Sequence, residues 1–452
     1  MKKETFTNQL GFVLTAAGCA IGLANIYRFP YLCGRYGGAL FMLLYLACVV
    51  LFAVPLLSME AAIGRSSRAS AARALETLRP DKPGWRIVQP ISYMGTYVSQ
   101  MFYAAIVAQM LYFAVSMFSG NLKGMNVPQL QEMSAHLSQS PLLTAGIVAF
   151  IVLCGFAVCF FGVRSGVERV NKIMLGILFL MMIALAVYSA TLPGAAEGLK
   201  FYLSPKLSKI EEAGFLEVLS AAFGQAFFSL GMGAGSICVF GSYMPKDSRI
   251  IPQVLKITAL DTAVALLGGF IIFPACFTYG IDPAGGPDLI IITMPAVSNQ
   301  MNGGRLLGTF FFVAMIMACF STIVTTYENI VACTMDLTGW KRRKAVLMNV
   351  LPLLLLCMPA VLGMSVWSNV RILGRSILDA EDFIVSNNLM PLGALGYLVF
   401  CINRRVGWGW DNFMWEANTG EYGMRFPAWL KKYCTYALPV MLIVFWLTGY
   451  VN

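Results

Sequence analysis

Two apolar stretches of this chain carry glycine and polar residues at their centres, where a plain membrane helix would have neither. In the first, residues 11–30, the interruption is formed by Gly18, Gly22 and Asn25. Backbone N–H and C=O groups that leave a helix inside a membrane must be satisfied by protein, water or ligand, so such breaks usually line a cavity. The first break therefore predicts a binding site for a polar ligand or an ion.

The second interrupted stretch, residues 224–245, has Gly231, Gly233 and Gly235 at its centre. Glycines also let membrane helices pack closely, and for one isolated break that explanation would be preferred. The GMGAG run resembles part of a dinucleotide-binding fingerprint, but it lacks the strand–turn–helix context and the downstream acidic residue. Two breaks at matching positions favour a ligand site.

The composition indicates an all-α polytopic membrane protein. Of 452 residues, 58% are hydrophobic and 12% are charged, against about 45–50% and about 25% in soluble domains. About eleven segments are long and apolar enough to cross a bilayer. These segments are residues 9–31, 38–62, 87–118, 141–161, 170–192, 215–243, 252–279, 304–335, 345–366, 383–403 and 430–449.

The order of the spans predicts one transmembrane domain over residues 1–452. The two broken spans are five spans apart, which is typical of two inverted five-helix repeats with the binding site at their interface. The repeats are predicted over residues 9–192 and 215–403, with an additional C-terminal transmembrane helix at 430–449.

The net charge of +10 comes from basic residues in short loops after the second, eighth and tenth spans. This alternation follows the positive-inside rule and predicts a cytoplasmic N-terminus and an external C-terminus, with the lipid bilayer rather than nucleic acid as the partner. The basic residues are Arg65, Arg68, Arg73, Arg79, Lys82, Arg86, Lys341, Arg342, Arg343, Lys344, Arg404 and Arg405.

The sequence shows no catalytic constellation. An intramembrane enzyme would need a nucleophile with a base, paired carboxylates or a metal cluster, and His136 is the only histidine. We therefore expect a protein that is not an enzyme.

Several segments resemble the neurotransmitter:sodium symporter family, in its bacterial amino-acid transporter branch. The resemblance covers nearly the whole chain and is most specific in GCAIGLANIYRFP, residues 18–30. The other matching segments are residues 55–65, 224–235, 242–247 and 318–322. It implies sodium-coupled import of an amino acid by alternating access in the bacterial cytoplasmic (inner) membrane.

The resemblance also implies two sodium sites built largely from oxygen atoms of unwound backbone, which suit a hard cation. The second site is expected to use backbone oxygens of Gly18, Ile21 and Ala318 and the hydroxyls of Ser321 and Thr322. The first is expected to use oxygens of Ala20 and Ser229, the side chains of Asn25 and Asp261, and the carboxylate of the substrate.

The substrate carboxylate is expected, by the same resemblance, to bind the Tyr103 hydroxyl and the N–H groups of Leu23 and Ala24. Gly22 stands where monoamine carriers of the family have an aspartate, which favours a substrate that brings its own carboxylate. The amino group is expected to meet carbonyl groups of Ala20, Phe228 and Ser229.

The side chain of the substrate is expected to be bulky and hydrophobic or aromatic. Gly231 and Ala234 stand where relatives selective for smaller amino acids carry larger residues, so the pocket should be wider. The residues expected to set selectivity are Ser99, Phe228, Gly231, Met232, Ala234, Thr322, Ile323 and Thr326.

Two thin gates are implied on either side of this site. The outer gate pairs Arg28 with Asp382 above Tyr103 and Phe228. The residues implied for the inner gate are Lys3, Phe6, Ser242, Tyr243 and Asp336. Glu60 matches a position that supports the second broken helix, and the sequence assigns no role to Glu328.

Chloride is not expected to take part in transport. In chloride-dependent members of the family the anion lies among positions matching Tyr45, Gln225, Ser229, Asp261 and Ala265. Here Asp261 replaces the usual asparagine and Ala265 lacks a hydroxyl, so the carboxylate can supply the negative charge itself.

Three other functions fit the same sequence: a transporter-like amino-acid sensor, a symporter for small aliphatic amino acids and a ligand-gated channel. Sodium stoichiometry, proton counter-transport and oligomeric state stay open at this stage.

Overall fold

The protein, seen here as a computed structural model, is described over residues 4–280, 292, 294–301 and 303–450, and its regular elements there are helices. The first part contains α1 (Gln9–Ala20), η1 (Ala24–Arg28), α2 (Phe29–Arg35), α3 (Ala39–Cys48), η2 (Val49–Ala53), α4 (Val54–Ser67), α5 (Ala74–Leu78), η3 (Pro83–Ile87), α6 (Gln89–Ser119), α7 (Val127–Ser138), α8 (Pro141–Phe160), η4 (Val163–Glu168) and α9 (Arg169–Ala190). These are followed by α10 (Ala195–Leu203), α11 (Leu207–Ala213), α12 (Phe215–Ser229), α13 (Ser236–Tyr243), α14 (Ile250–Tyr279), α15 (Met294–Gln300), α16 (Gly304–Thr338), α17 (Arg342–Gly363), α18 (Ile377–Ile384), η6 (Val385–Leu389), α19 (Met390–Ile402), α20 (Trp410–Asn418), α21 (Leu430–Lys432), η7 (Tyr433–Ala437) and α22 (Leu438–Thr448).

The helices confirm the prediction of an all-helical polytopic membrane protein. Among the described residues, nine helical segments are long and apolar enough to cross a membrane, and the bent pair Gln9–Ala20 and Ala24–Arg35 makes ten. The sequence predicts eleven spans because it also counts residues 215–243. That stretch is divided into α12 and α13, and each is shorter than the ~20 residues that a span requires.

Both breaks arise where the sequence places glycine. α1 ends because Ile21 has an extended backbone, with φ −70° and ψ 108°, and the two halves of the span meet at 58°. Between α12 and α13, Gly231, Gly233 and Gly235 have φ values of 58°, 82° and 80°. Glycine reaches this left-handed region without a Cβ clash, so the chain can turn there without strain.

The second break is held against α4 by close backbone contact. A Cβ atom at Gly64 would overlap the carbonyl group of Cys238, and a Cβ at Gly241 would overlap the backbone of α4. The buried Glu60 carboxylate accepts hydrogen bonds from the N–H groups of Gly233 (3.2 Å) and Cys238 (3.4 Å). These bonds satisfy backbone donors that the turn releases from helical pairing.

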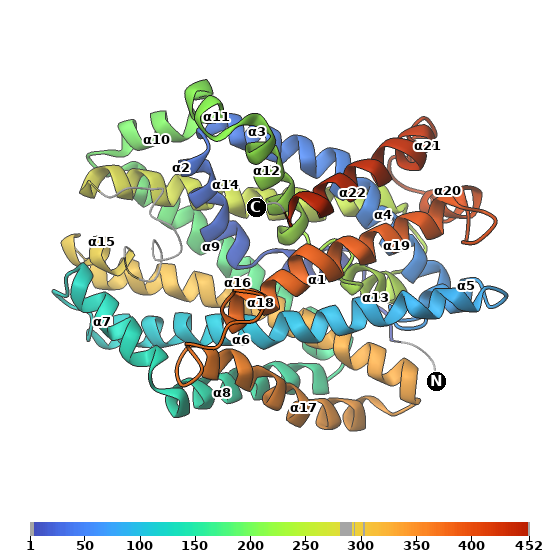
Figure 1. The fold of residues 1–452 in the computed structure, drawn as a ribbon, viewed down its shortest axis with the longest axis horizontal. Coiled ribbons are helices and arrows are strands. Elements are labelled where there is room, and N and C mark those ends of the chain that lie inside the picture. The colour runs from blue at the N-terminus through green and yellow to red at the C-terminus, as the bar shows by residue number, and fades with distance from the viewer. Residues whose placement is uncertain (1–3, 281–291, 293, 302, 451–452) are drawn as a thin grey trace.

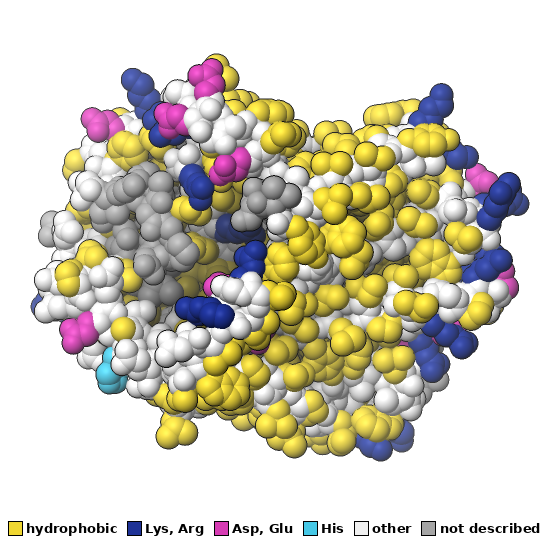
Figure 2. Space-filling view, in the orientation of Figure 1, with side chains coloured by type: hydrophobic (Ala, Val, Ile, Leu, Met, Phe, Trp, Pro, Cys, Tyr) yellow, Lys and Arg dark blue, Asp and Glu magenta, His cyan; other side chains and the backbone are white. Residues whose placement is uncertain are grey.

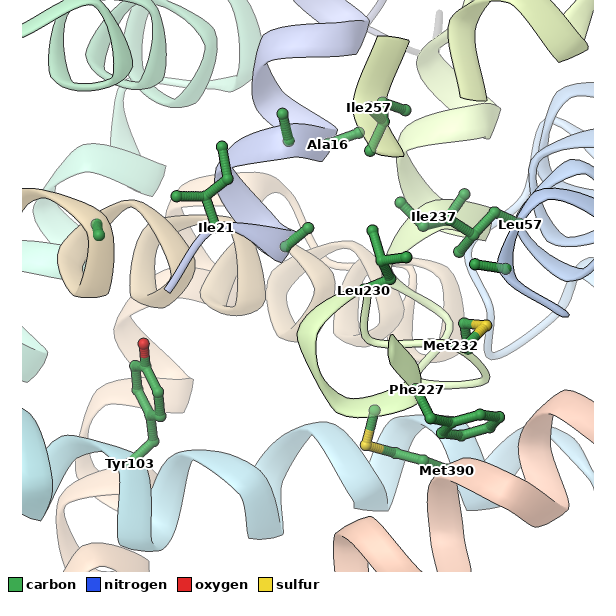
Figure 3. Close-up of a cluster of buried hydrophobic side chains, with 14 of the residues drawn as sticks. Ala16, Ile21, Leu57, Tyr103, Phe227, Leu230, Met232, Ile237, Ile257 and Met390 are labelled. Carbon is green, nitrogen blue, oxygen red and sulfur yellow. The ribbon is translucent and has the colours of Figure 1, made fainter. Parts of the chain in front are cut away.

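The two breaks lie together in the core of the bundle. Figure 3 shows Ile21 from the first break and Leu230 from the second, with Tyr103 rising from α6 toward the first break. The long helices α6, α14 and α16 run through the same core, and most of the apolar segment of each is buried. Their arrangement therefore surrounds the broken segments with protein rather than lipid.

The surface divides into two polar ends and an apolar band. In Figure 1, α7, α10, α11 and α15 lie at one end, and α5, α20 and the N-terminus lie at the other. Figure 2 shows Lys and Arg side chains gathered at the end that holds α5 and α20, with hydrophobic side chains between the ends. Large apolar side chains such as Leu180 and Leu355, in the long helices α9 and α17, are exposed, as contact with lipid requires.

Candidate functional site

Oxygen atoms from the first break and from α16 converge on one small region. The Ser321 hydroxyl lies 2.7 Å from the Gly18 carbonyl oxygen. The Thr322 hydroxyl lies 3.3 Å from the Gly18 oxygen, 3.1 Å from the Ile21 oxygen and 3.3 Å from the Ala318 oxygen. The structure thus brings together the oxygen atoms predicted for the second sodium site, and carbonyl and hydroxyl oxygens are suitable ligands for a hard cation.

A second polar cluster surrounds Asp261, which is fully buried in α14. Its carboxylate accepts hydrogen bonds from the Asn25 amide (2.7 Å), the Ser229 hydroxyl (2.9 and 3.0 Å) and the Tyr45 hydroxyl (3.2 Å). The Asn25 side-chain oxygen accepts the N–H of Gly22 at 3.0 Å and keeps a second lone pair. The side chains of Asn25, Ser229 and Asp261, three residues predicted for the first sodium site, therefore contact one another.

The donors around Asp261 are all neutral, so the cluster contributes a buried negative charge that favours a cation nearby. Gln225, one of the positions matching a chloride site, donates instead to the Ala24 carbonyl oxygen at 2.9 Å. Ala265 is fully buried and offers no hydroxyl. The positions that match a chloride site therefore surround the Asp261 carboxylate, which carries the negative charge within the protein itself.

A cavity of about 100 Å³ lies between the two breaks, α6, α16 and η6. It is adjacent to both polar clusters because Ser229 and Thr322 belong to its lining. The predicted site residues that line it are Ala20, Gly22, Leu23, Ala24, Ser99, Tyr103, Phe228, Ser229, Gly231, Ala234, Thr322 and Thr326.

The Tyr103 hydroxyl lies beside the first break. A Cβ atom at Gly22 would be 2.9 Å from this hydroxyl oxygen and 3.0 Å from the Thr322 hydroxyl oxygen, so only glycine fits without displacement. Within the described part of the chain, the Tyr103 hydroxyl has no hydrogen-bond partner. Leu23 and Ala24 begin the second half of the broken span, where free N–H groups and the helix dipole attract an anion.

Two predicted selectivity residues do not line the cavity. Met232 is fully buried and lies beyond Leu230 as seen from Tyr103 in Figure 3. Ile323 is fully buried and faces α8, since its Cγ2 would be 3.0 Å from a Cβ atom at Gly155.

Other lining residues were missed in the sequence. Thr96 and Gln100 lie one helical turn before predicted positions on α6, so helical spacing could have found them. Val385 and Met390 come from η6 and α19, and no local pattern marks them. The missed lining residues are Cys19, Gly95, Thr96, Gln100, Phe102, Ser236, Val385 and Met390.

The predicted outer gate lies between the cavity and a vestibule of about 530 Å³. The Arg28 guanidinium lies 5.4 Å from the ring centroid of Phe228, and the Asp382 carboxylate accepts the Ser386 hydroxyl at 2.6 Å. Phe228 and Met390 line both the cavity and the vestibule and therefore separate them.

At the opposite end, the N-terminal segment packs on α13. The Phe6 N–H donates to the Tyr243 carbonyl oxygen at 3.2 Å, and the two rings meet edge to face with centroids 5.9 Å apart. Phe6 is 2% exposed, so this contact closes the core on that side. Lys3, the basic residue predicted for this gate, lies outside the described residues.

The other predicted inner-gate residues contact the loop after α4. The Asp336 carboxylate accepts the backbone N–H of Ser70 at 2.6 Å. Arg68 donates to the Ser242 carbonyl oxygen at 3.2 Å. Both contacts join α16 and α13 to the same short loop.

Glu328, to which the sequence assigns no role, is buried at the centre of an ionic network that reaches the surface at Glu4. Its carboxylate accepts the Tyr243 hydroxyl at 2.9 Å and two Arg342 nitrogen atoms at 2.6 and 3.0 Å. Arg342 also pairs with Glu4 at 3.2 Å, and Glu4 accepts the Val163 N–H at 2.6 Å. Sequence reasoning missed the network because Arg342 lies within a basic loop that the positive-inside rule already explains.

Comparison with known proteins assigns the family. The sequence model of the sodium:neurotransmitter symporter family matches residues 3–129 and 125–451. An uncharacterized sodium-dependent transporter of Haemophilus influenzae is 30% identical over 460 residues, covering 99% of this chain and 98% of that protein. The uncharacterized sodium-dependent transporter YhdH of Bacillus subtilis is 35% identical over 395 residues, covering 87% of this chain and 86% of that protein.

A solved structure of similar fold agrees with this result. The crystal structure of MhsT in complex with L-phenylalanine superposes with a TM-score of 0.86 at 33% identity, covering 99% of this chain and all of that one. The chain therefore belongs to the sodium:neurotransmitter symporter family, and it is a sodium-dependent transporter rather than an enzyme.

Proposed function

We propose that the protein imports neutral L-amino acids with bulky hydrophobic or aromatic side chains, coupled to two sodium ions. The observation that carries the proposal is the convergence of the Gly18, Ile21, Ala318, Ser321 and Thr322 oxygen atoms directly beside the central cavity. The L-phenylalanine bound to MhsT supports an amino-acid substrate.

Residues shared between the cavity and the two proposed sodium sites support the coupling of substrate transport to sodium. Thr322 contacts the oxygen cluster and also lines the cavity, and Ser229 joins the Asp261 cluster to the same cavity. Substrate carboxylate placed beside Tyr103 and Asn25 lies close to both cation positions, so each ligand raises the affinity for the other.

Two closed layers, one on each side of the cavity, support transport by alternating access. The Phe228 and Met390 layer separates the cavity from the vestibule, and the Phe6 and Tyr243 contact closes the opposite end. Opening these layers in turn moves substrate and sodium across the membrane, with the binding site at the interface of the inverted repeats proposed at 9–192 and 215–403.

The proposed location is the bacterial cytoplasmic membrane, with the N-terminus in the cytoplasm and the C-terminus outside. The gathering of Lys and Arg at the end that holds α5, α20 and the N-terminus supports this orientation (Figure 2). The buried Asp261 carboxylate supports transport without chloride.

Uptake into proteoliposomes tests the proposal. Labelled phenylalanine, tryptophan, leucine and alanine are offered under an inward sodium gradient, with potassium replacing sodium as the control. Accumulation of the bulky amino acids only with sodium is expected. Binding without accumulation would instead identify a sensor. Preferential uptake of alanine would identify a transporter for small amino acids, and a sodium flux far above the substrate flux would identify a channel.

A further inference from the structure

Ser99, Gln100 and Thr326 are polar side chains of the cavity lining outside the group of residues proposed to hold the amino-acid backbone. Ser99 and Gln100 precede Tyr103 by about one turn on α6, and Thr326 follows Thr322 by one turn on α16. The part of the cavity that these side chains line would receive the side chain of a bound amino acid.

The hydroxyl groups of Ser99 and Thr326 donate their protons to backbone carbonyl groups. The Ser99 hydroxyl donates to the Thr96 carbonyl oxygen at 2.8 Å, and the Thr326 hydroxyl donates to the Thr322 carbonyl oxygen at 2.7 Å. A hydroxyl that donates in this way keeps its lone pairs for a second partner. Both residues therefore present acceptors to the cavity.

Gln100 adds a third acceptor that the protein leaves unsatisfied. Its side chain is 2% exposed, and its amide oxygen has no hydrogen-bond partner among the residues that the structure describes. A buried polar atom without a partner has lost its hydrogen bonds to water and gained none in return. A ligand that supplies a donor reverses this loss.

The chemistry of the remaining lining restricts that donor. The described lining contains no acidic side chain, so it does not favour an ammonium or guanidinium group. Phe102, Phe228, Val385 and Met390 offer apolar surface for a ring. A neutral donor at the end of an aromatic side chain satisfies both conditions.

We propose that Ser99, Gln100 and Thr326 make the site selective for amino acids whose bulky side chain carries a hydrogen-bond donor, such as the indole N–H of tryptophan or the phenol O–H of tyrosine. The inference rests on the proposed function, because it assumes that the cavity binds an amino acid. A site built to bind such a donor discriminates strongly against the analogue without one, since its own acceptors are then left unpaired.

Competition against sodium-driven uptake tests the selectivity. Labelled tryptophan is taken up by proteoliposomes, and unlabelled tyrosine, phenylalanine, tryptophan and 1-methyltryptophan are added as inhibitors. Inhibition constants at least about tenfold lower for tyrosine than for phenylalanine, and for tryptophan than for its 1-methyl derivative, are expected. Equal constants within both pairs would overturn the inference.

Three variants test whether these residues cause the preference for a side chain with a hydrogen-bond donor. Gln100→Leu, Ser99→Ala and Thr326→Val should each reduce the ratio of the phenylalanine to the tyrosine inhibition constant, and Gln100→Leu should bring this ratio within about threefold. Gln109→Leu, on the same helix but outside the cavity lining, is the matched control and should keep the full preference. Unchanged discrimination in all three variants would overturn the assignment.

The outcome also separates this inference from the function on which it rests. Sodium-driven uptake of tryptophan and phenylalanine with equal inhibition constants refutes only the donor selectivity. A complete lack of sodium-driven uptake refutes the transport proposal itself.

Discussion

Replacing Glu328 by glutamine should open the inner end of the protein. The substitution keeps the size of the side chain and an acceptor for Tyr243, but it removes the charge that pairs with two Arg342 nitrogen atoms. A hydrogen bond to a charged group contributes about 1.5–3 kcal/mol net. If the network holds only while the inner end is closed, the equilibrium shifts about ten- to hundredfold toward the open form.

Labelling of Cys19 measures this shift. Cys19 lines the cavity, and Cys154 is the other cysteine that is not buried. The measurements are therefore made in a background protein that carries Cys154→Ser, so that Cys19 is the cysteine that reacts. A membrane-impermeant maleimide applied from the cytoplasmic side should label Cys19 at least about tenfold faster in Glu328→Gln. Labelling from the outside should slow.

The control removes a carboxylate of a similar ion pair on the surface. Glu212 pairs with Lys209 at 2.8 Å, and both side chains are about half exposed. Glu212→Gln should leave the labelling unchanged, because exposed pairs contribute about 0–1 kcal/mol. Equal labelling of Cys19 in Glu328→Gln and in the background would refute the assignment of the network to the inner gate.

Three further predictions concern the central site. Asn25→Ala should abolish sodium-dependent substrate binding while the protein stays folded, because a ligand oxygen and the bond to Asp261 are lost; an unchanged sodium titration of binding would exclude Asn25 from the site. Ala234→Phe should reduce uptake of aromatic amino acids relative to alanine, since overpacking costs about 1–3 kcal/mol; a wild type that prefers glycine or alanine would contradict the wide pocket. Replacing chloride by gluconate should leave uptake intact, whereas Asp261→Asn should impair it and, combined with Ala265→Ser, make the residual uptake respond to chloride; strong chloride dependence of the wild type would contradict this account.

The sequence predicts those parts of the site that depend on backbone chemistry. Glycine at 18, 22, 231, 233 and 235 marks the breaks because few other residues tolerate the turn or the close contact there. The breaks are local features, and a single sequence suffices to find them. The residues of the oxygen cluster were instead implied by the family resemblance, and the structure brings their oxygen atoms together.

Features that depend on distant packing were not predicted. Nothing near Met232 or Ile323 in the sequence shows that their side chains face other helices rather than the cavity. The pairing of Glu328 with Arg342 and Glu4 needs three segments to meet, and charge patterns alone do not show which basic residue is the partner. Which side of a buried helix faces the cavity is set by its contacts with distant segments, and a short stretch of sequence does not contain this information.

The close contact between α4 and α13 has a consequence for how the transporter can move. With Gly64 and Gly241 bringing the two backbones together and Glu60 bonded to the turn, α13 cannot swing away from α4 without losing buried contacts along its length. The two helices must travel as one rigid body whenever the inner end opens. Bending then falls outside the pair, at the π-helical η2 that leads into α4.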